Sequence, residues 1–407
     1  AVGTVNTTGV VTSTGNGTTY VRATNGATTD STLVTVNSQL ARSCGVAGGA
    51  LHPDTIAASE TWRAVDSPHL LHPLGLTVTN GAVLTLEPGA WVCANQTEFI
   101  DFRNHGRLVA TGTTVDTIVF TARNAAQGWR GVAFEGGTAD TSRLNHVRVE
   151  YGDQKFAGSA IQASESHVVM IDSSVVRQSR QAALILRGAG SYVRHSVIDT
   201  AAALGPTSPS VILGPGTAWI GNTLRKAAGM GVITEAGTPV TLSGGRVENS
   251  GGIGIYATGD VTSSAPVRIV GSTTYPIMAG PQVLATMYPS VAAQDSLIGN
   301  GRDTIVVRCC ALNSGTAYVS SVIPWAVREN ITFGGAAALN VGPSALVTMD
   351  SASQMFFNGN ARLIAVGNAG AKARIEGRNA ATRQIQFLPL TGGTAGADTS
   401  RIRHAQF

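Results

Sequence analysis

Five segments of the chain share one short pattern, a run of alternating apolar and polar residues that ends in a small residue. The central apolar residues of these runs are Val149, Val176, Ile198, Leu224 and Val247, which follow one another at steps of 27, 22, 26 and 23 residues. Alternation with a period of two is typical of β-strands rather than helices. A repeat of this length with one such strand per period is typical of a solenoid, in which each coil packs against its neighbours. The sequence therefore predicts stacked β-coils.

The residue that follows each of these apolar residues is charged, and the sign alternates along the series. The five charged residues are Glu150, Arg177, Asp199, Arg225 and Glu248. If the strands of successive coils stack in parallel at about 4.8 Å, these side chains form one column on the outer face. Opposite charges across from each other stabilise such pairing by some tenths of a kcal/mol. We predict that this charge ladder sets the register of the coils and has no catalytic role.

The composition fits thin coils with tight corners and disfavours several classes of function. Glycine contributes 49 of the 407 residues, while aromatic residues make up only 5%. The net charge is +4 and only three of the 28 basic residues are lysine, so we predict no basic stripe for nucleic acid. No run of 18 apolar residues exists, so no membrane span is predicted. The chain shows no initiator methionine or signal peptide, which indicates a mature product or a fragment. No cofactor is predicted.

The four cysteines are Cys44, Cys93, Cys309 and Cys310, and their spacing does not match a zinc site. In an exported protein one or two disulfides are expected, most simply one that involves Cys44 and Cys93. A bond between the adjacent Cys309 and Cys310 is a second possibility, with a strained geometry. The sequence alone does not determine the connectivity.

Residues 1–38 alternate valine and threonine between glycine and asparagine turns, which predicts a β-rich segment. The pattern resembles the second half of a bacterial immunoglobulin-like domain of group 2. The matching residues are Val5, residues 9–12, Gly15, Gly17, Thr18, Ala23, Thr24 and residues 34–36. This resemblance covers under a tenth of the chain and implies a partial immunoglobulin-like segment, whose missing strands lie outside the chain or come from a neighbour. Residues 39–61 contain several glycines and a proline and are predicted to be a linker.

From Trp62 onward the predicted strands become longer, and four sequence motifs follow one another in a recognisable order. These are LTVTNGAVLTLEPGAWV at residues 76–92, GRLVATGT at 106–113, DTIVFTA at 116–122 and GWRGVAF at 128–134. The order resembles the opening of secreted bacterial right-handed parallel β-helix surface proteins, over residues 62–275. The resemblance implies an all-β fold, a right-handed parallel β-helix, and a secreted, extracellular location at a cell surface. It implies little about activity, because one scaffold hosts many functions.

The same order of sequence motifs begins again near the end of the chain. Residues 331–347 align with residues 76–92 at a constant offset of 255. Leu108, Ala110 and Gly112 correspond to Leu363, Ala365 and Gly367 at that offset, and residues 140–147 correspond to 398–405 after a three-residue insertion. We therefore predict a first β-helix super-repeat at residues 62–316 and the start of a second at 317–407.

A groove enzyme that acts on polysaccharides needs carboxylates that converge on one site. The closest acidic pairs are Glu98 with Asp101 and Glu150 with Asp153. A spacing of three places the two members on opposite faces of a strand, which works against convergence. No catalytic residue is therefore predicted. A row of exposed aromatic side chains would instead favour glycan binding, and the five tryptophans could either form one or pack at corners: Trp62, Trp91, Trp129, Trp219 and Trp325.

His146 and His195 occupy the same position in their coils, and His404 is the super-repeat equivalent of His146. A stack of histidines could bind metal. However, the other coils place Ser173, Gly221 and Gly244 at this position. We predict polar corner residues and no metal site.

Taken together, these patterns favour a non-enzymatic structural or adhesive solenoid of a bacterial surface or matrix. Half a sandwich at the front and an uncapped coil at Phe407 fit two alternatives equally, head-to-tail assembly into a fibre and a passive rod within a larger adhesin. The expected partners are other copies of the chain, a larger surface protein, or glycans. The alternative is a lyase, hydrolase or glycan-binding protein on the same scaffold.

Overall fold

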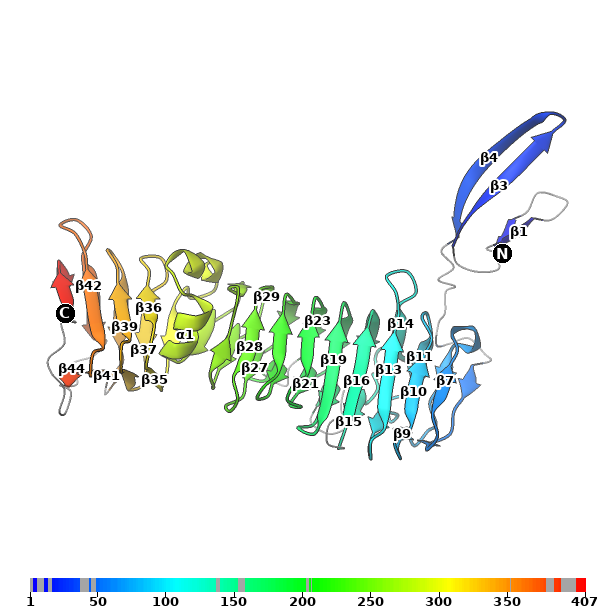
Figure 1. Cartoon of the computed structure of the whole chain (residues 1–407), viewed down its shortest axis with the longest axis horizontal. Helices are drawn as coiled ribbons and strands as arrows, with labels where there is room; N and C mark the ends of the chain where they lie inside the picture. Colours follow the sequence, from blue (N-terminus) through cyan, green and yellow to red (C-terminus); the bar gives the residue numbers. More distant parts are fainter. Residues whose placement is uncertain are drawn as a thin grey trace.

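The computed structural model describes residues 3–5, 11–13, 17–36, 44, 49–136, 140–152, 158–202, 205, 207–351, 353–377, 384–388 and 400–407. These residues form an all-β chain that is dominated by a parallel β-solenoid, a long rod of stacked coils (Figure 1). None of the helices within these ranges has the length and apolar character needed to span a bilayer.

Each coil of the first part of the rod contributes one strand to each of three parallel sheets. The nine-stranded sheet contains β7 (Glu60–Trp62), β10 (Val83–Leu86), β13 (Arg107–Thr111), β16 (Asp140–Asn145), β19 (His167–Asp172), β22 (Tyr192–Arg194), β25 (Ala218–Ile220), β28 (Val240–Ser243) and β31 (Val261–Thr262). The ten-stranded sheet contains β5 (Ala50–Leu51), β8 (His69–Leu70), β11 (Trp91–Ala94), β14 (Ile118–Ala122), β17 (Val147–Glu150), β20 (Val175–Ser179), β23 (Val197–Ala201), β26 (Thr223–Ala227), β29 (Arg246–Glu248) and β32 (Arg268–Val270).

The third sheet has fifteen strands among the described residues and runs the full length of the rod. It contains β6 (Thr55–Ile56), β9 (Leu76–Val78), β12 (Ile100–Phe102), β15 (Val132–Phe134), β18 (Ser159–Ala163), β21 (Ala182–Leu186), β24 (Pro209–Leu213), β27 (Met230–Thr234), β30 (Ile255–Ala257), β33 (Ile277–Ala279), β34 (Ile305–Val307), β37 (Trp325–Val327), β40 (Leu346–Met349), β43 (Ala373–Gly377) and β46 (Ala405–Gln406).

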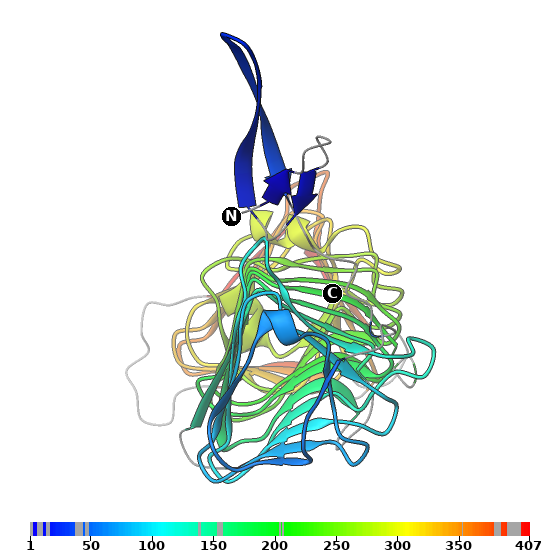
Figure 2. The same ribbon diagram turned by 90° about the vertical axis from the view of Figure 1, so that its right-hand side faces the viewer.

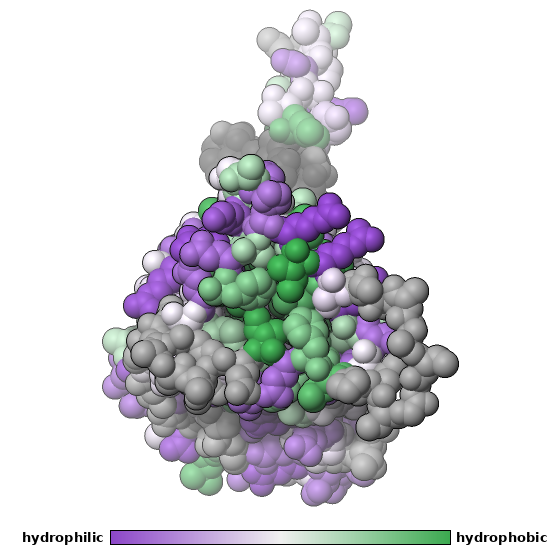
Figure 3. Space-filling model, turned by 90° about the vertical axis from the view of Figure 1, so that its left-hand side faces the viewer, coloured by the Kyte–Doolittle hydropathy of each residue, from purple (hydrophilic) through white to green (hydrophobic). Residues whose placement is uncertain are grey.

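Alternation along the strands builds one continuous core inside the rod. In β19, His167, Val169 and Ile171 are buried, while Val168 and Met170 are partly exposed. Burial of a valine or isoleucine stabilises a fold by roughly 1.5–3 kcal/mol, and every coil adds several such side chains. The end-on view of the last described coils shows this core in section, with apolar side chains in the centre and hydrophilic ones around them (Figure 3).

The register of the coils is the one that the sequence spacing predicts. Val149 pairs with Val176, Val176 with Ile198, Ile198 with Leu224, and Leu224 with Val247. All five side chains are at most 1% exposed. A shift by one residue would move each of them to the outer face, so burial of this column specifies the pairing strongly.

The solenoid begins earlier than the sequence predicts. The stretch expected to be a linker, residues 39–61, contains β5, β6 and most of β7, which pair with β8, β9 and β10. The rod therefore starts at Ala50 rather than at Trp62, and the linker prediction was wrong for residues 50–61, while residues 39–43 and 45–48 lie outside the described residues. Strands of two residues are too short to show a period of two, which explains the error. A single turn of 3-10 helix, η1 (Ala64–Asp66), follows β7.

Two antiparallel pairs precede the rod. β1 (Gly3–Val5) pairs with β2 (Val11–Ser13), and β3 (Gly17–Asn25) pairs with β4 (Thr28–Val36). The second pair is a long twisted hairpin that projects away from the coils (Figure 2). These pairs are β-rich, as expected, whereas an immunoglobulin-like sandwich stays a prediction.

A short helical segment interrupts two of the three sheets. After β33 the chain forms α1 (Pro281–Met287) and then η2 (Ala292–Leu297) before it returns to β34. Pro281 at the first helical position favours the start of α1, and Val283, Leu284 and Met287 form its buried face. Tyr288 closes the segment, and its buried hydroxyl donates a hydrogen bond of 3.0 Å to the carbonyl oxygen of Val267.

Beyond this junction the two interrupted sheets are replaced by two new four-stranded sheets. One contains β35 (Ala311–Leu312), β38 (Ile331–Phe333), β41 (Gln354–Asn358) and β44 (Gln384–Leu388). The other contains β36 (Thr316–Val319), β39 (Ala338–Val341), β42 (Arg362–Val366) and β45 (Arg401–Arg403). Helix α1 contacts both β31 and β36, so it lies between the nine-stranded sheet and its successor (Figure 1).

The strands of the second part repeat those of the first at the offset of 255 residues. The bounds of β38, β39 and β40 coincide with those of β9, β10 and β11 at this offset. The sheets do not repeat in the same way, because β11 belongs to the ten-stranded sheet and its equivalent β40 belongs to the fifteen-stranded sheet. Before the junction the fifteen-stranded sheet is built from strands such as β9, and after it from equivalents of β11 such as β40. Because this sheet continues through the junction, it joins the two super-repeats.

Candidate functional site

The predicted charge ladder lies in one column. Strand pairing aligns Glu150 with Arg177, Arg177 with Asp199, Asp199 with Arg225, and Arg225 with Glu248. The side chains do not form an unbroken chain of contacts, because each arginine pairs with the acid that precedes it. Arg177 Nε donates to Glu150 Oε1 at 2.6 Å, and Arg225 Nε lies 3.1 Å from Asp199 Oδ2. The ladder is therefore two ion pairs along the axis.

The two ends of the ladder have different surroundings. Glu150 is 6% exposed, and it also accepts a hydrogen bond of 3.0 Å from Thr121 Oγ1 and contacts Arg148 Nε at 2.9 Å. Glu248 contacts Arg246 of its own strand at 3.0 Å. The arginines neutralise both carboxylates, and the contacts of Glu150 with Thr121 and Arg177 join neighbouring strands.

The acidic pair Glu98 and Asp101 does not form a shared site. Glu98 is buried and accepts hydrogen bonds from the backbone N–H and the side chain of Asn95, at 2.8 Å and 2.7 Å. Asp101 is buried and forms an ion pair with Arg103. Each carboxylate is thus bound by a residue close to it in the sequence, Glu98 by Asn95 and Asp101 by Arg103. Asp153, the partner expected for Glu150, lies outside the described residues.

The column that contains His146 and His195 is a corner of the coil. His146, Ser173, His195, Gly221 and Gly244 all have φ between 47° and 62°, the left-handed region that turns the chain sharply. His404 has φ of 45° at the equivalent corner of the second super-repeat. His195 contacts an acid here, with its Nδ1 3.3 Å from Asp172 Oδ1, and the same carboxylate oxygen accepts a hydrogen bond of 3.1 Å from Ser173 Oγ. Within the described ranges, no group of three or more histidine, cysteine, aspartate or glutamate side chains is placed to hold a metal ion.

A polar ladder inside this corner connects successive coils. Ser174 Oγ accepts the N–H of Val147 at 3.0 Å, and Ser196 Oγ accepts the N–H of Ser174 at 3.0 Å. Asn222 Oδ1 then accepts the N–H of Ser196 at 2.8 Å, while its Nδ2 donates to the carbonyl oxygen of Val193 at 2.7 Å. Asn222 is fully buried, so it satisfies two backbone groups that water does not reach. This turn ladder is the structural role that the coil-end serines and Asn222 perform.

The tryptophans do not form an exposed row. Trp62, Trp129, Trp219 and Trp325 are each at most 2% exposed and lie in the core. Trp91 is partly buried, with the guanidinium of Arg148 5.9 Å from its ring centre. The tryptophans therefore contribute packing rather than a sugar platform.

Both possible disulfides form. Cys44 bonds to Cys93 of β11, which ties the segment before the rod to the ten-stranded sheet. Cys309 bonds to Cys310 in an exposed turn that follows β34. Both residues of this turn have positive φ, 38° and 73°.

One open hollow lies beside the fifteen-stranded sheet, lined by Gln162, Ser164, Glu165, Ser166 and Arg187, with a volume of about 460 Å³. Its arginine is held by Glu235, two coils further on, through hydrogen bonds of 2.7–3.1 Å. The hydrogen bonds that Arg187 donates to the Glu235 carboxylate raise the pKa of Arg187. Gly214 lies between them, where a Cβ would be 2.8 Å from the Cα of Arg187, so glycine leaves room for the ion pair to cross.

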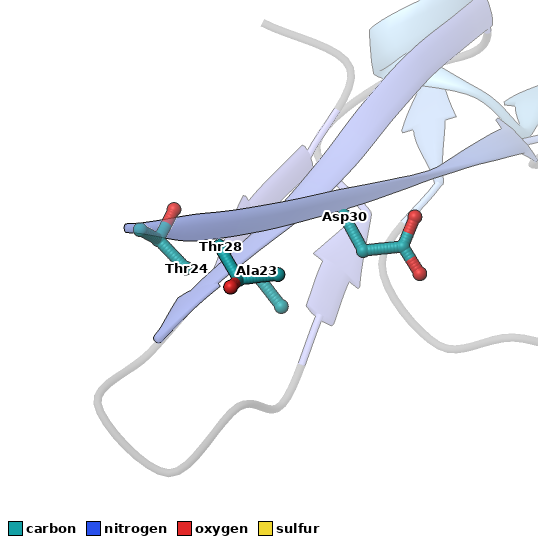
Figure 4. Close-up of a pocket in the computed structure, with 4 residues that line it drawn as sticks. All are labelled: Ala23, Thr24, Thr28 and Asp30. Atoms are coloured by element: carbon teal, nitrogen blue, oxygen red, sulfur yellow. The ribbon is translucent and has the colours of Figure 1, made fainter. Parts of the chain in front are cut away.

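A second shallow hollow lies on the hairpin and is lined by Ala23, Thr24, Thr28 and Asp30 (Figure 4). The carboxylate of Asp30 accepts the N–H of Ser31 at 2.7 Å. The lining offers one charged group on an open surface, which is too little to define a chemical site.

One buried and one partly buried histidine have pKa values well below their ordinary range. His167 is fully buried in the core, and burial lowers its pKa to about 4. Its Nε2 lies 2.9 Å from Ser142 Oγ, which itself accepts the N–H of Leu108. His52 stacks on Trp62 at 3.9 Å, and burial together with the neighbouring His69 lowers its pKa to about 4.

We expect the rod to lose stability as the pH falls from about 6.5 to 4. An unfolded histidine takes up its proton near pH 6.5, whereas His52 and His167 stay neutral in the fold until about pH 4. Their stabilising contribution is therefore complete above pH 6.5 and is lost below it, by roughly 2 kcal/mol for His167. Urea unfolding at pH 7 and pH 4.5 measures this loss. The variant His167→Gln should show a smaller drop between the two pH values, while the control His404→Gln, at an exposed corner, should behave as the wild type does.

A cluster of arginines and tyrosines lies on the outer face of the fifteen-stranded sheet, at the junction, and was not predicted from the sequence. Arg302 Nη1 and Arg328 Nη2 both donate to the hydroxyl of Tyr275, at 2.8 Å and 2.5 Å. Beside them, Arg308 Nη1 donates to the hydroxyl of Tyr256 at 3.1 Å. No motif marks these residues, because they come from several coils with different loop lengths.

Comparisons with protein-family models, with curated proteins and with solved structures return no significant match to this chain. Its function is therefore inferred from the geometry of the solenoid.

Proposed function

We propose that this chain is a non-enzymatic structural rod of an extracellular surface or matrix. The observation that supports this role most directly is the super-repeat. Strands equivalent to β9–β11 begin again at β38, and they continue the same rod through one shared sheet. A scaffold of this kind lengthens by adding units, and each new unit needs only its neighbour for stability. The architecture therefore provides a rod whose length is set by the number of units.

The size and surface of the rod support the same role. Fifteen strands in one sheet, at about 4.8 Å per step, correspond to a length of about 67 Å. Charged side chains on the outer face form ion pairs between successive coils, as Glu150 does with Arg177 and Asp199 with Arg225. The disulfide between Cys44 and Cys93 fits an oxidising location outside the cell.

A binding role for glycans is the second candidate. The arginine and tyrosine cluster at Tyr256 and Tyr275 favours it over degradation, because it offers cationic donors and aromatic rings. A rod that carries such a cluster would be adhesive as well as structural. A polysaccharide lyase or hydrolase is the competing function that the test below addresses.

Electron microscopy of the purified protein at neutral pH, combined with an assay for release of new chain ends from acidic and neutral polysaccharides, tests the proposal. We expect rods of constant width and no release above a heat-unfolded control. Filaments longer than one chain, with a regular axial repeat, would extend the role to head-to-tail assembly. Steady release of chain ends by the folded protein would contradict the structural role.

A further inference from the structure

Tyr275 packs against the outer face of the fifteen-stranded sheet at the junction between the super-repeats. Its side chain packs with Met278 and Val306 and is 7% exposed. Arg302 and Arg328 come from the next two coils, and each places its guanidinium over the tyrosine ring, 5.5 Å and 5.0 Å from the ring centre. Three successive coils therefore meet at one phenol.

The two arginines bring like charges close together. Both donate to the same hydroxyl oxygen, so their donor nitrogens are within about 5 Å of each other. Among the described residues, the contact of Arg328 with an acid is a longer one, 3.7 Å from its Nε to Asp350 Oδ2, and the side chain of Arg302 contacts Tyr275. The neutral phenol accepts hydrogen bonds but does not neutralise the two positive charges. An oxyanion bound between the two guanidinium groups would neutralise them in part.

The surroundings of this pair fit a sugar better than a bare ion. Tyr256, a partly exposed ring, lies on β30, and Arg308 donates to its hydroxyl. Arg308 also donates to Glu329 Oε1 at 2.6 Å, so this second pair is neutral overall. It offers donors, acceptors and an aromatic face, which are the groups that bind sugar hydroxyls and rings. The side chains of Arg308 and Glu329 are 40% and 37% exposed, so a ligand can reach them.

We propose that this surface binds an acidic sugar chain, with the carboxylate of one uronic acid unit between Arg302 and Arg328 and a neighbouring unit against Tyr256 and Arg308. The guanidinium forks supply charge-assisted hydrogen bonds to the carboxylate oxygens. Tyr275 positions both forks before the ligand arrives, which lowers the cost of ordering them. The inference rests on the second candidate function, glycan binding, for which it names the class of sugar, and it does not depend on the structural role.

The test uses the whole chain and three probes: a trigalacturonate, a neutral glucose trimer of the same length, and sodium sulfate. Calorimetric titration at low ionic strength measures binding to the wild type, to Arg302→Gln and to Arg302→Gln/Arg328→Gln. The control is Arg246→Gln, since Arg246 is exposed as Arg302 is, but it lies on the ten-stranded sheet and is paired with Glu248. Urea unfolding of each variant reports whether the substitutions act through stability.

We expect the wild type to bind the trigalacturonate and not the neutral trimer. The double variant should bind about tenfold more weakly or worse, and Arg246→Gln should bind as the wild type does. Equal binding of the neutral trimer, or unchanged binding by the double variant, would overturn the proposal. Sulfate binding as tight as that of the trigalacturonate would overturn the sugar part. A cluster that only fastens the coils together would show altered urea midpoints with no binding to lose.

Discussion

Replacement of Asn222 by leucine should reduce the free energy of unfolding by about 3 kcal/mol. Leucine has nearly the same shape, but it leaves the N–H of Ser196 and the carbonyl oxygen of Val193 without their partners. Both groups are inside the rod, and each unsatisfied buried group costs roughly 1–3 kcal/mol. Urea unfolding measures the total, and amide hydrogen exchange in β22 and β23 should locate the loss.

The control for this variant is Asn330→Leu. Asn330 also accepts a backbone N–H, from Gln354 at 2.9 Å, but it is exposed, and water can replace it. Its effect should stay below about 1 kcal/mol. If both variants lost the same stability, or if exchange rose evenly along the rod, the turn ladder would not be what holds this corner.

Replacement of Trp325 by alanine should cost about 3–5 kcal/mol. Trp325 is fully buried in β37, the strand that follows β34 in the sheet that joins the two super-repeats. Since α1 and η2 interrupt the other two sheets here, the cavity falls where the rod has the fewest strand pairs. Hydrogen exchange should therefore increase most in β37–β43, while β17–β29 stay protected.

Trp91→Ala is the control for size, because Trp91 is partly exposed in the outer wall of the first super-repeat. We expect it to lose roughly half as much stability, with exchange raised near β11 only. Uniform loss of protection along the whole rod after Trp325→Ala would show that the junction is not a boundary between cooperative units.

The periodic part of the fold could be predicted from sequence, because its physical cause is local. Alternation and burial place Val149, Val176 and Ile198 in one column, and this register also aligns the charged residue that follows each of them. The ladder contacts were only partly foreseeable. Register brings Arg177 next to both Glu150 and Asp199, but one guanidinium turned toward Glu150 cannot also hold the other acid.

Features without a period were missed for the same reason. Residues 281–297 break the alternation, so nothing in the sequence pattern indicated that α1 and η2 would replace two strands of a coil. The cluster at Tyr275 depends on how far the loops before β34 and after β37 carry Arg302 and Arg328 around the coil. Such distances follow from the folded path of the chain, not from spacing along it.

The orientation of the strands also determines how the rod would respond to tension. Strands lie across the axis, so the hydrogen bonds between coils point along it. A pull on the two ends of the chain would therefore open these bonds one coil at a time, rather than all rows together. Each coil of 22–27 residues would release about 75–95 Å of extended chain. Such a rod lengthens in many small steps and dissipates mechanical work, while the coils not yet opened keep their structure.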